Sequence, residues 1–478
     1  MLEKIVSTVN DIVWSPALVI LLISAGLYFS IRTRFVQVRR LKLMVKLLFA
    51  KKKDEEPAEG QDPSQPKTKG VSSFQAFCMA IAGRVGTGNI VGVATAIAMG
   101  GPGAIFWMWV IAFLGASTAF VESTLAQLYK FPHKSEWRGG PTCYIDEGLK
   151  QRWLGFIFAI FTIIGYGLLI VTVQANGMAS AAFNAFQLKP LYGGIILAAL
   201  LLLVIVGGLS RSARVAEIIT PFMAVAYILF SLIIVGVNYK AVPGVFHMIF
   251  SSAVGMHSVF GGIIGSAIAF GVKRGLFSNE AGEGGGAIIS ASADVSHPAK
   301  QGLVQAFSVY VDTLLVCTAT ALMILCSGTY NVFGANGEII VAGAPELGNN
   351  YVGFTQAAVD GVFSGFGSAF VSIALFFFVF TTIIAYDVYA ESSIAYLCTT
   401  GGKHHRVLEI ILVWVYRALL IATVIFGALK EANIVWMMGD IGVGLTTWIN
   451  VIVILILSPQ AFRALKDLEK KDKAGELD

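Results

Sequence analysis

Eleven apolar stretches, most of them about 20 residues long or longer, dominate this 478-residue chain. An α-helix needs roughly 20 residues to cross the hydrocarbon core of a bilayer. Hydrophobic residues make up 56% of the chain and charged residues 13%, whereas soluble proteins average about 25% charged residues. The connections between the stretches leave no soluble segment long enough for a separate core. The sequence therefore predicts an all-α polytopic membrane protein and argues against a soluble enzyme.

The predicted spans run over 12–31, 73–99, 103–129, 154–183, 192–208, 215–237, 258–277, 301–327, 362–397, 407–428 and 434–457. The first span is expected to stay in the mature protein, because no basic start or small-residue cleavage site accompanies it. The basic, amphipathic segment 35–53 is expected to lie on the membrane surface. The segment 54–70, rich in Pro, Glu, Gln, Lys and Asp, is typical of a flexible linker.

The basic residues alternate between the two sides of these spans. Of the 34 Lys and Arg residues, 28 fall in every second connection, and the intervening connections hold only Lys4, Lys189, Lys240 and Lys430. Basic residues concentrate in cytoplasmic connections. This pattern predicts a multi-pass cell-membrane protein with its N-terminus outside and its C-terminus in the cytoplasm.

Other classes of site find little support. The five cysteines are far apart with no CxxC pair, which indicates neither a disulfide scaffold nor a cysteine zinc site. The six histidines lie mostly near span ends without HExxH spacing, which argues against a membrane-embedded enzyme. The glycine-rich stretch 283–287 lacks the Lys-Ser/Thr of a P-loop, which argues against a primary pump. No repeated filter loops support a channel.

The second predicted span carries its own interruption. Gly86, Thr87, Gly88 and Asn89 follow one another near its middle, and glycine and asparagine are poor helix formers. Because unpaired peptide groups are costly in hydrocarbon, an unwound stretch persists where it lines a cavity or binds a ligand. Freed N–H groups suit a carboxylate, and freed carbonyls suit a cation. Close helix packing through small residues is the alternative.

A second glycine-interrupted stretch lies at 261–271. When the first span is set aside, the interrupted helices are the first and sixth of ten, which is the arrangement of an inverted repeat. The chain is then one transmembrane transporter domain over 1–478. Its expected parts are an extra helix at 12–31, a basic amphipathic segment and cytoplasmic linker at 32–72, five-helix repeats at 73–237 and 258–457, and a cytoplasmic tail at 458–478.

Several motifs carry a family resemblance: Val-Gly-Thr-Gly-Asn at 85–89, Gly-Gly-Pro-Gly-Ala-Ile-Phe-Trp-Met-Trp at 100–109, Arg-Gly-Leu-Phe-Ser-Asn-Glu-Ala-Gly at 274–282, His-Pro at 297–298, Lys-Gln-Gly at 300–302 and Asp-Thr at 312–313. Over nearly its full length the chain resembles the alanine/glycine:cation symporter family, also called sodium:alanine symporters. The resemblance implies the leucine-transporter fold with one extra helix in front. The chain departs from the family pattern at 285–287, where Gly-Gly-Ala replaces Ser-Ala-Pro, and we interpret 283–287 as a flexible inner gate or helix break.

The resemblance also implies a substrate site. Thr87 and Gly88 would offer backbone N–H groups to the carboxylate of an amino acid, and Asn89 would add its side-chain amide. Ser266, Phe270 and nearby carbonyls of the second interrupted helix would receive the amine and close the pocket.

A sodium site is implied as well. It would use the carbonyls of Ala82 and Val85 and the hydroxyls of Thr381 and Thr382. Such a site has no carboxylate, which suits a weakly bound monovalent ion. The alternative is that these hydroxyls bond to the backbone of their own helix.

Two amides lie deep in the fourth predicted span. A buried amide is costly without a partner, so Gln174 is a candidate to contact the substrate carboxylate, with Asn176 as a second candidate. An interhelical hydrogen bond is the alternative for Gln174.

Asp312, Arg417 and Asp440 are ionisable residues that fall inside predicted spans. From the helix rise, Asp312 and Arg417 lie roughly 16–18 Å from the inner ends of their spans, so we expect Arg417 to pair with Asp312 or Asp440. A structural ion pair is favoured over a gating role, because breaking a buried pair is strongly destabilising. The residues nearer the cytoplasmic side, which form either an inner gate or a solvated rim, are Arg84, Glu122, Asp387 and Glu391.

The sequence and the resemblance together predict a secondary active symporter, not an enzyme, that imports a small neutral amino acid, alanine or glycine, with Na+ as the coupling ion. A proton-coupled or glutamine- or serine-preferring symporter of the same fold is the alternative, and a channel is a more remote one. The expected partners are the amino acid and the lipid bilayer. Neither nucleic acid nor an obligatory protein partner is expected.

Overall fold

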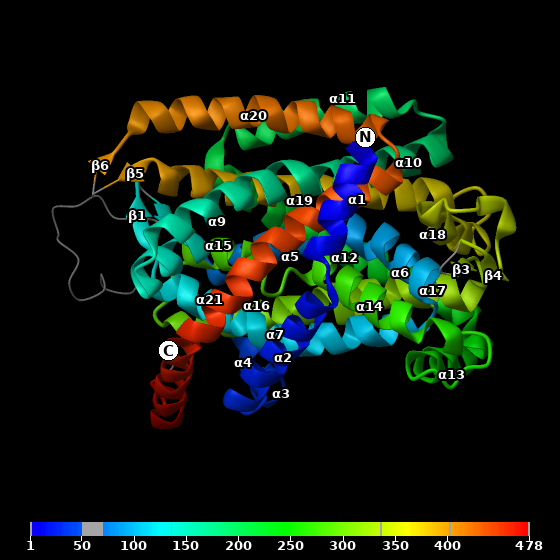
Figure 1. Ribbon diagram of the computed structural model, residues 1–478, viewed down its shortest axis with the longest axis horizontal. Helices are drawn as coiled ribbons and strands as arrows, with labels where there is room; N and C mark the ends of the chain where they lie inside the picture. The colour runs from blue at the N-terminus through cyan, green and yellow to red at the C-terminus, as the bar shows by residue number, and fades with distance from the viewer. Residues whose placement is uncertain (1, 50–69, 135, 335–336, 401–402, 477–478) are drawn as a thin grey trace.

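The computed structural model describes residues 2–49, 70–134, 136–334, 337–400 and 403–476. Most of the long helices run along the longest axis of the molecule, while α21 and the α1–α2 pair cross them obliquely (Figure 1). This arrangement is a single helical bundle, as the apolar stretches predict.

The first half of the chain contains α1 (Leu2–Val13), α2 (Pro16–Arg32), α3 (Val36–Arg39), α4 (Leu41–Leu48), α5 (Ser73–Arg84), η1 (Gly88–Gly92), α6 (Val93–Gly100), α7 (Gly103–Leu128), α8 (Pro141–Cys143), η2 (Tyr144–Gly148), α9 (Arg152–Ile164), η3 (Gly165–Leu169), α10 (Ile170–Phe186), α11 (Pro190–Ile205) and α12 (Gly208–Val237). Here η marks a short π or 3-10 helix.

The second half contains η4 (Tyr239–Ala241), α13 (Val242–Ala253), η5 (Gly261–Ile263), α14 (Ile264–Asn279), α15 (Gly285–Ser292), α16 (Pro298–Val309), η6 (Tyr310–Cys317), α17 (Thr318–Ser327), η7 (Pro345–Leu347), α18 (Tyr351–Asp360), α19 (Gly367–Leu397), α20 (Arg406–Leu429) and α21 (Ala432–Ala474). Three antiparallel hairpins join helices: β1 (Phe131–His133) with β2 (Glu136–Arg138), β3 (Asn331–Phe333) with β4 (Ile339–Ala342), and β5 (Thr399–Thr400) with β6 (Lys403–His404).

A helix lies at each of the eleven predicted spans. In the described part of the chain, eight helices are long and apolar enough to cross a membrane, and nine if the bent pair formed by α5 and η1–α6 is one span. The other two predicted spans correspond to α11 and α14, which have only 16 residues each. The polytopic helical class is confirmed, whereas the count of eleven is not established.

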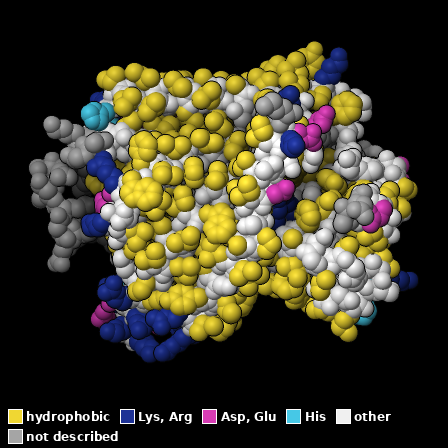
Figure 2. Space-filling model, viewed as in Figure 1, with side chains coloured by type: hydrophobic (Ala, Val, Ile, Leu, Met, Phe, Trp, Pro, Cys, Tyr) yellow, Lys and Arg dark blue, Asp and Glu magenta, His cyan; other side chains and the backbone are white. Residues whose placement is uncertain are grey.

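The outer surface of the bundle is apolar. Phe222 and Ile218 on α12 are 72% and 67% exposed, and Leu203 on α11 is 63% exposed. Hydrophobic side chains cover most of the face seen in Figure 2. Contiguous apolar surface of this extent is not tolerated in water, which fits a bundle surrounded by lipid.

The connections gather at two opposite ends of the bundle. The β1–β2 and β5–β6 hairpins lie at one end, whereas α13, α18 and the β3–β4 hairpin lie at the other (Figure 1). The first group belongs to connections that the charge pattern predicts to be cytoplasmic, and the β3–β4 hairpin belongs to the connection 328–361, which has no Lys or Arg.

The described part of the basic segment, up to residue 49, forms α3 and α4. Met44, Leu47 and Leu48 of α4 are buried, so this face packs on the protein, and the segment is not simply laid on lipid. Arg40 Nη1 lies 2.5 Å from Asp472 Oδ2 near the end of α21. Helix α21 thus continues well beyond the predicted end of its span. The predicted linker 54–70 lies almost entirely outside the described residues.

Candidate functional site

The first core helix is broken where the sequence predicts. Helix α5 ends at Arg84, and Val85 is extended with φ −80° and ψ 92°. The chain then resumes as η1 and α6 at an angle of 52° to α5. Residues 78–98 are all buried, so the break faces protein and not lipid, as unpaired backbone at membrane depth requires.

Side chains hold the peptide groups that the break frees. The Gly86 N–H donates to Asn89 Oδ1 at 2.9 Å. The Thr87 N–H donates to Gln174 Oε1 at 2.8 Å. Gln174 lies on α10 and is 1% exposed. Its side-chain amide, a predicted contact of the substrate carboxylate, hydrogen-bonds to the broken helix in this structure.

Asn89 connects the broken helix to a buried carboxylate. Its Nδ2 donates to Asp312 Oδ1 at 2.6 Å. The other oxygen, Asp312 Oδ2, accepts from Ser278 Oγ at 2.8 Å and from Thr313 Oγ1 at 2.7 Å. Asp312 is fully buried. It therefore joins the break in the first core helix to the C-terminal end of α14.

A cluster of oxygens surrounds Thr382, on α19. Its Oγ1 lies 2.8 Å from Ala82 O, 3.2 Å from Val85 O and 2.8 Å from Phe378 O. A hydroxyl has one proton and donates to one acceptor at a time. Three carbonyl oxygens therefore surround a hydroxyl that can donate to only one of them. The structure thus brings together three of the four residues predicted for the ion.

Thr381, the fourth, behaves differently. Its Oγ1 bonds to Phe377 O at 3.0 Å and Phe378 O at 3.1 Å, both in its own helix. This is the backbone-bonded alternative.

Gly86 lies between the two predicted sites. A Cβ atom there would be 2.7 Å from Gln174 Oε1 and 2.7 Å from Thr382 Oγ1. Carbon and oxygen atoms do not approach this closely without displacement, so glycine is required for the two side chains to close on the break.

The predicted position of the second break was wrong. The stretch 261–271 belongs mostly to continuous helix, since α14 runs from Ile264 to Asn279. A Cβ at Gly271 would be 2.5 Å from Ala104 O, and one at Gly275 would be 2.4 Å from Ile111 Cγ2. These glycines allow α14 to pack closely on α7, which is a packing role and not a break.

The helix instead breaks between Asn279 and Gly285. Glu280, Gly282 and Gly284 have positive φ values of 54°, 97° and 95°, and α15 begins immediately afterwards. The stretch 283–287, interpreted as a gate or helix break, thus overlaps the real break. A Cβ at Gly285 would lie 2.6 Å from Tyr389 Cε2, which explains glycine at this departure from the family pattern.

Ser266 and Phe270 consequently lie away from the first break. Both are partly exposed on α14, and the Ser266 carbonyl lies beside Gly100, at the far end of α6. The α14 residues that reach the break are Phe277 and Ser278, since a Cβ at Gly88 would be 3.2 Å from Phe277 Cδ1. Sequence reasoning missed both, although they belong to the quoted motif at 274–282.

The predicted partner of Arg417 was wrong. Arg417 Nη2 lies 2.5 Å from Glu391 Oε1 and 2.6 Å from Ile205 O. Helix α20 lies at the edge of the bundle, where fewer than a third of the residues in its most apolar part are buried. The depth of a residue along its helix does not show which way its side chain points around the helix axis. Depth alone therefore does not predict which carboxylate Arg417 contacts.

Asp440 pairs with two cations of α14. Its carboxylate lies 2.6 Å from Arg274 Nη2 and 2.7 Å from Lys273 Nζ. The charge pattern counts both cations with a cytoplasmic connection, although they fall inside the predicted span 258–277. In the structure they lie on α14, with side chains only 15% and 3% exposed, so they belong to the interior of the bundle.

Asn176 does not reach the break. Its Nδ2 donates to Gly427 O at 3.2 Å and Lys430 O at 2.7 Å. These are carbonyls at the C-terminal end of α20 and just after it, so Asn176 satisfies a helix end.

Three buried carboxyl groups surround the second break. Glu122 accepts from Asn450 Nδ2 at 2.9 Å, Glu283 from Tyr166 OH at 2.9 Å and Glu280 from Tyr389 OH at 3.1 Å. Arg84 lies nearby and donates to Gln305 Oε1 at 3.3 Å and also to Ser308 Oγ. Arg84, Glu122 and Asp387 are at most 2% exposed, which excludes a solvated rim for them.

These features describe a membrane-embedded solute transporter: a helical bundle whose first core helix is interrupted in the interior and surrounded by buried polar groups. The model of the sodium:alanine symporter family matches residues 1–478. The chain belongs to the sodium:alanine symporter family.

Curated relatives align along most of the chain. The sodium/proton-dependent alanine carrier protein of Bacillus sp. (strain PS3) is 48% identical over 407 residues, which cover 85% of this chain and 90% of the relative. The "Probable sodium/glutamine symporter GlnT" of Bacillus subtilis is 41% identical over 474 residues, 99% and 92% of the two chains. The sodium/alanine symporter AgcS of Methanococcus maripaludis is 36% identical over 483 residues, 98% and 99% of the two chains.

Proposed function

We propose that this protein imports a small neutral amino acid, alanine or glycine by preference, together with Na+. The observation that carries the proposal is the position of the Thr382 hydroxyl beside the Ala82 and Val85 carbonyls. Gly86 separates this cluster from the Thr87 amide that Gln174 holds. An ion and a carboxylate bound here would be neighbours.

The oxygen cluster suits a monovalent cation. Two carbonyls freed by the break and one hydroxyl supply neutral oxygens, and half-helix carbonyls coordinate Na+ in transporters with broken helices. A bound Na+ would take lone pairs from these three oxygens, and the Thr382 hydroxyl would keep its proton and donate it to the Phe378 carbonyl, which lies 2.8 Å away. We assign Ala82, Val85 and Thr382 to this site and leave Thr381 out.

The Thr87 amide suits a carboxylate. Gln174 Oε1 accepts from it now, and a substrate carboxylate oxygen is an acceptor of the same kind. In the proposed bound state the carboxylate takes this position, and the Gln174 side chain turns its amide toward the other carboxylate oxygen. The Gly88 N–H and Asn89 complete the site.

The surroundings favour a small side chain. Phe277 lies over Gly88, and its ring packs against Trp436 with centroids 5.1 Å apart. Two aromatic rings this close to the break leave little space beyond an α-carbon substituent, which favours alanine or glycine over glutamine.

Coupling follows from the shared backbone. Na+ at Ala82 and Val85 fixes the conformation of the break, which orients the Thr87 and Gly88 amides for the carboxylate. Each ligand thereby raises the affinity for the other. Asn89 and Asp312 transmit the change to the end of α14, so binding biases one conformation of the two broken helices.

Proton coupling is the second candidate, and the buried carboxyl groups favour it. No Lys or Arg side chain in the described part of the chain lies within 4 Å of a carboxylate oxygen of Glu122, Glu280 or Glu283, and all three are at most 1% exposed. Several buried carboxylates near a single arginine cannot all be ionised at low cost. Relatives whose names include both sodium and proton dependence are consistent with either ion.

We further propose the expected topology: an N-terminus outside, a C-terminus in the cytoplasm, and two five-helix repeats at 73–237 and 258–457. The hairpin β1–β2 and the break after α14 would then belong to the cytoplasmic half of the pathway.

Uptake into proteoliposomes tests the function. With an inward Na+ gradient, radiolabelled alanine should accumulate, and excess unlabelled alanine or glycine should compete better than serine or glutamine. Collapsing the Na+ gradient with an ionophore should abolish accumulation. Accumulation that ignores Na+ and follows an imposed pH gradient would replace the sodium assignment with proton coupling.

A further inference from the structure

A histidine–carboxylate cluster lies at the end of the bundle that carries β1–β2 and β5–β6. It consists of His133 at the end of β1, His404 in β6 and Glu409 in the first turn of α20. One side-chain nitrogen or oxygen atom of each lies within 4.8 Å of those of the others. His133 and Glu409 are buried, and His404 is exposed.

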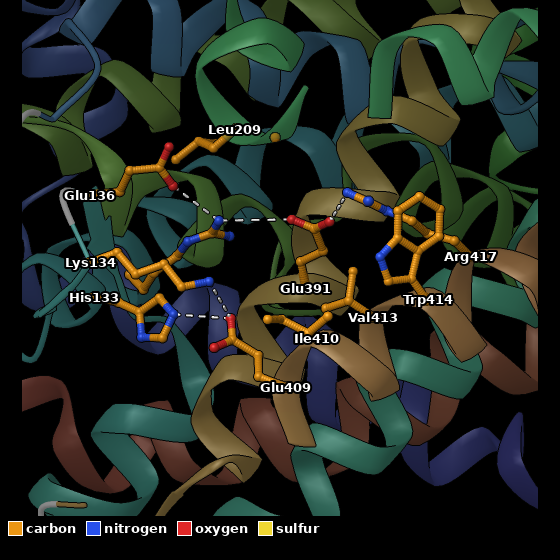
Figure 3. A pocket seen from close by; sticks show the side chains of 12 residues that line it. His133, Lys134, Glu136, Leu209, Glu391, Glu409, Ile410, Val413, Trp414 and Arg417 are labelled. Atoms are coloured by element: carbon orange, nitrogen blue, oxygen red, sulfur yellow. Dashed lines mark hydrogen bonds and ion pairs between the residues drawn. The ribbon is translucent and has the colours of Figure 1, made fainter. Parts of the chain in front are cut away.

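The three side chains converge on one point. His133 Nε2 lies 3.1 Å from Glu409 Oε1, and a dashed line joins these two side chains in Figure 3. His404 Nε2 hydrogen-bonds to the other carboxylate oxygen, Glu409 Oε2. The centroids of the two imidazole rings are 4.8 Å apart, and the ring planes are nearly perpendicular. Two ring nitrogens thus aim at one carboxylate from separate segments of the chain.

This donor set matches a transition metal. Two histidines and a glutamate form a known zinc ligand set that leaves a fourth position open. Tetrahedral ligands about 2.0–2.1 Å from zinc are roughly 3.4 Å from one another, close to the 3.1 Å between His133 and Glu409. A cavity of about 320 Å³ adjoins His133 and Glu409, which gives the fourth position access to water.

We propose that His133, His404 and Glu409 bind one divalent transition-metal ion, with Zn2+ as the best fit. The ion would join the β1–β2 hairpin to β6 and α20, which lie more than 270 residues further along the chain. It would therefore brace this end of the bundle independently of the substrate site.

Lys134 is the competitor for the same carboxylate. Its Nζ lies 3.1 Å from Glu409 Oε1, and its side chain is 54% exposed, so it can turn into solvent when a metal binds. Removing its charge should strengthen metal binding.

Calorimetric titration of the purified full-length protein, without a histidine tag, with Zn2+ tests the proposal. The parent should bind one Zn2+ per chain, and His404→Gln should weaken this binding at least tenfold. Because His404 is exposed, this variant is expected to fold normally. His405→Gln, which changes the neighbouring histidine outside the cluster, should bind Zn2+ as the parent does.

Two further results complete the test. Lys134→Met should bind Zn2+ more tightly than the parent, and Zn2+ should raise the melting temperature of the parent and His405→Gln but not of His404→Gln. A parent that binds no Zn2+, or a His404→Gln variant that binds it as tightly as the parent, would overturn the proposal.

Discussion

Thr382→Val should raise the Na+ concentration for half-maximal alanine uptake at least tenfold. Valine has nearly the same shape as threonine but lacks the hydroxyl that lies 2.8 Å from Ala82 O and 3.2 Å from Val85 O. A tenfold change corresponds to about 1.4 kcal/mol of Na+ binding free energy, and we expect the loss of one oxygen ligand to weaken Na+ binding by at least this amount. Uptake into proteoliposomes, measured against Na+ at fixed alanine, gives the value.

Thr381→Val is the matched control. It is the adjacent residue with the same substitution, and its hydroxyl bonds only to carbonyls of α19. Its Na+ dependence should stay within about twofold of the parent, which is under 0.5 kcal/mol. Equal losses in the two variants would mean that Thr382 has no special role in ion binding.

Asp440→Asn should lower the free energy of unfolding by about 3–5 kcal/mol, the usual cost of removing one partner from a buried ion pair. Arg274 is 3% exposed at its side chain, and its Nη2 lies 2.6 Å from both Asp440 oxygens. Lys273 Nζ lies 2.7 Å from the same carboxylate. Without the carboxylate, two cations remain in the bundle uncompensated.

Thermal unfolding in detergent measures this change. Asp467→Asn is the control on the same helix, because Asp467 is 55% exposed at its side chain and its removal should have little effect. An Asp440→Asn variant with the melting temperature of the parent would show that the Arg274–Asp440 pair contributes little to stability.

The first break was predictable because its sequence combines two signals. Glycine weakens the helix, and the Thr and Asn beside it need partners in a buried setting. Gln174 is the partner of Thr87 and Asp312 is the partner of Asn89, and both lie on other helices. The sequence and the resemblance place Gln174 near the break but do not place Asp312 there. The role of Asp312 as acceptor for Asn89 required the three-dimensional arrangement.

The second break was misplaced because glycine has two uses in membrane helices. Gly271 and Gly275 weaken a helix in principle, yet here they let α14 approach α7. The real break follows Asn279, where three alternate positions, Glu280, Gly282 and Gly284, have positive φ values. A non-glycine residue in this conformation cannot be recognised from sequence alone.

The ion pairs were not predictable, because pairing depends on helix rotation as well as on depth. Arg417 and Asp440 both fall inside predicted spans, but Arg417 faces Glu391 and Asp440 faces Arg274. Contacts between distant helices also explain why the cluster of His133, His404 and Glu409 has no sequence spacing that reveals it.

Alanine binding to the purified protein tests most directly whether the break at 85–88 holds an amino acid and Na+ side by side. Equilibrium binding of radiolabelled alanine is measured in Na+ and in choline, for the parent and for Gly86→Ala, whose new Cβ would press on both Gln174 and Thr382. The parent should bind one alanine per chain in Na+ only. Gly86→Ala, once shown to be monodisperse and therefore folded, should bind none. Unchanged binding by Gly86→Ala, with or without Na+, would contradict this account.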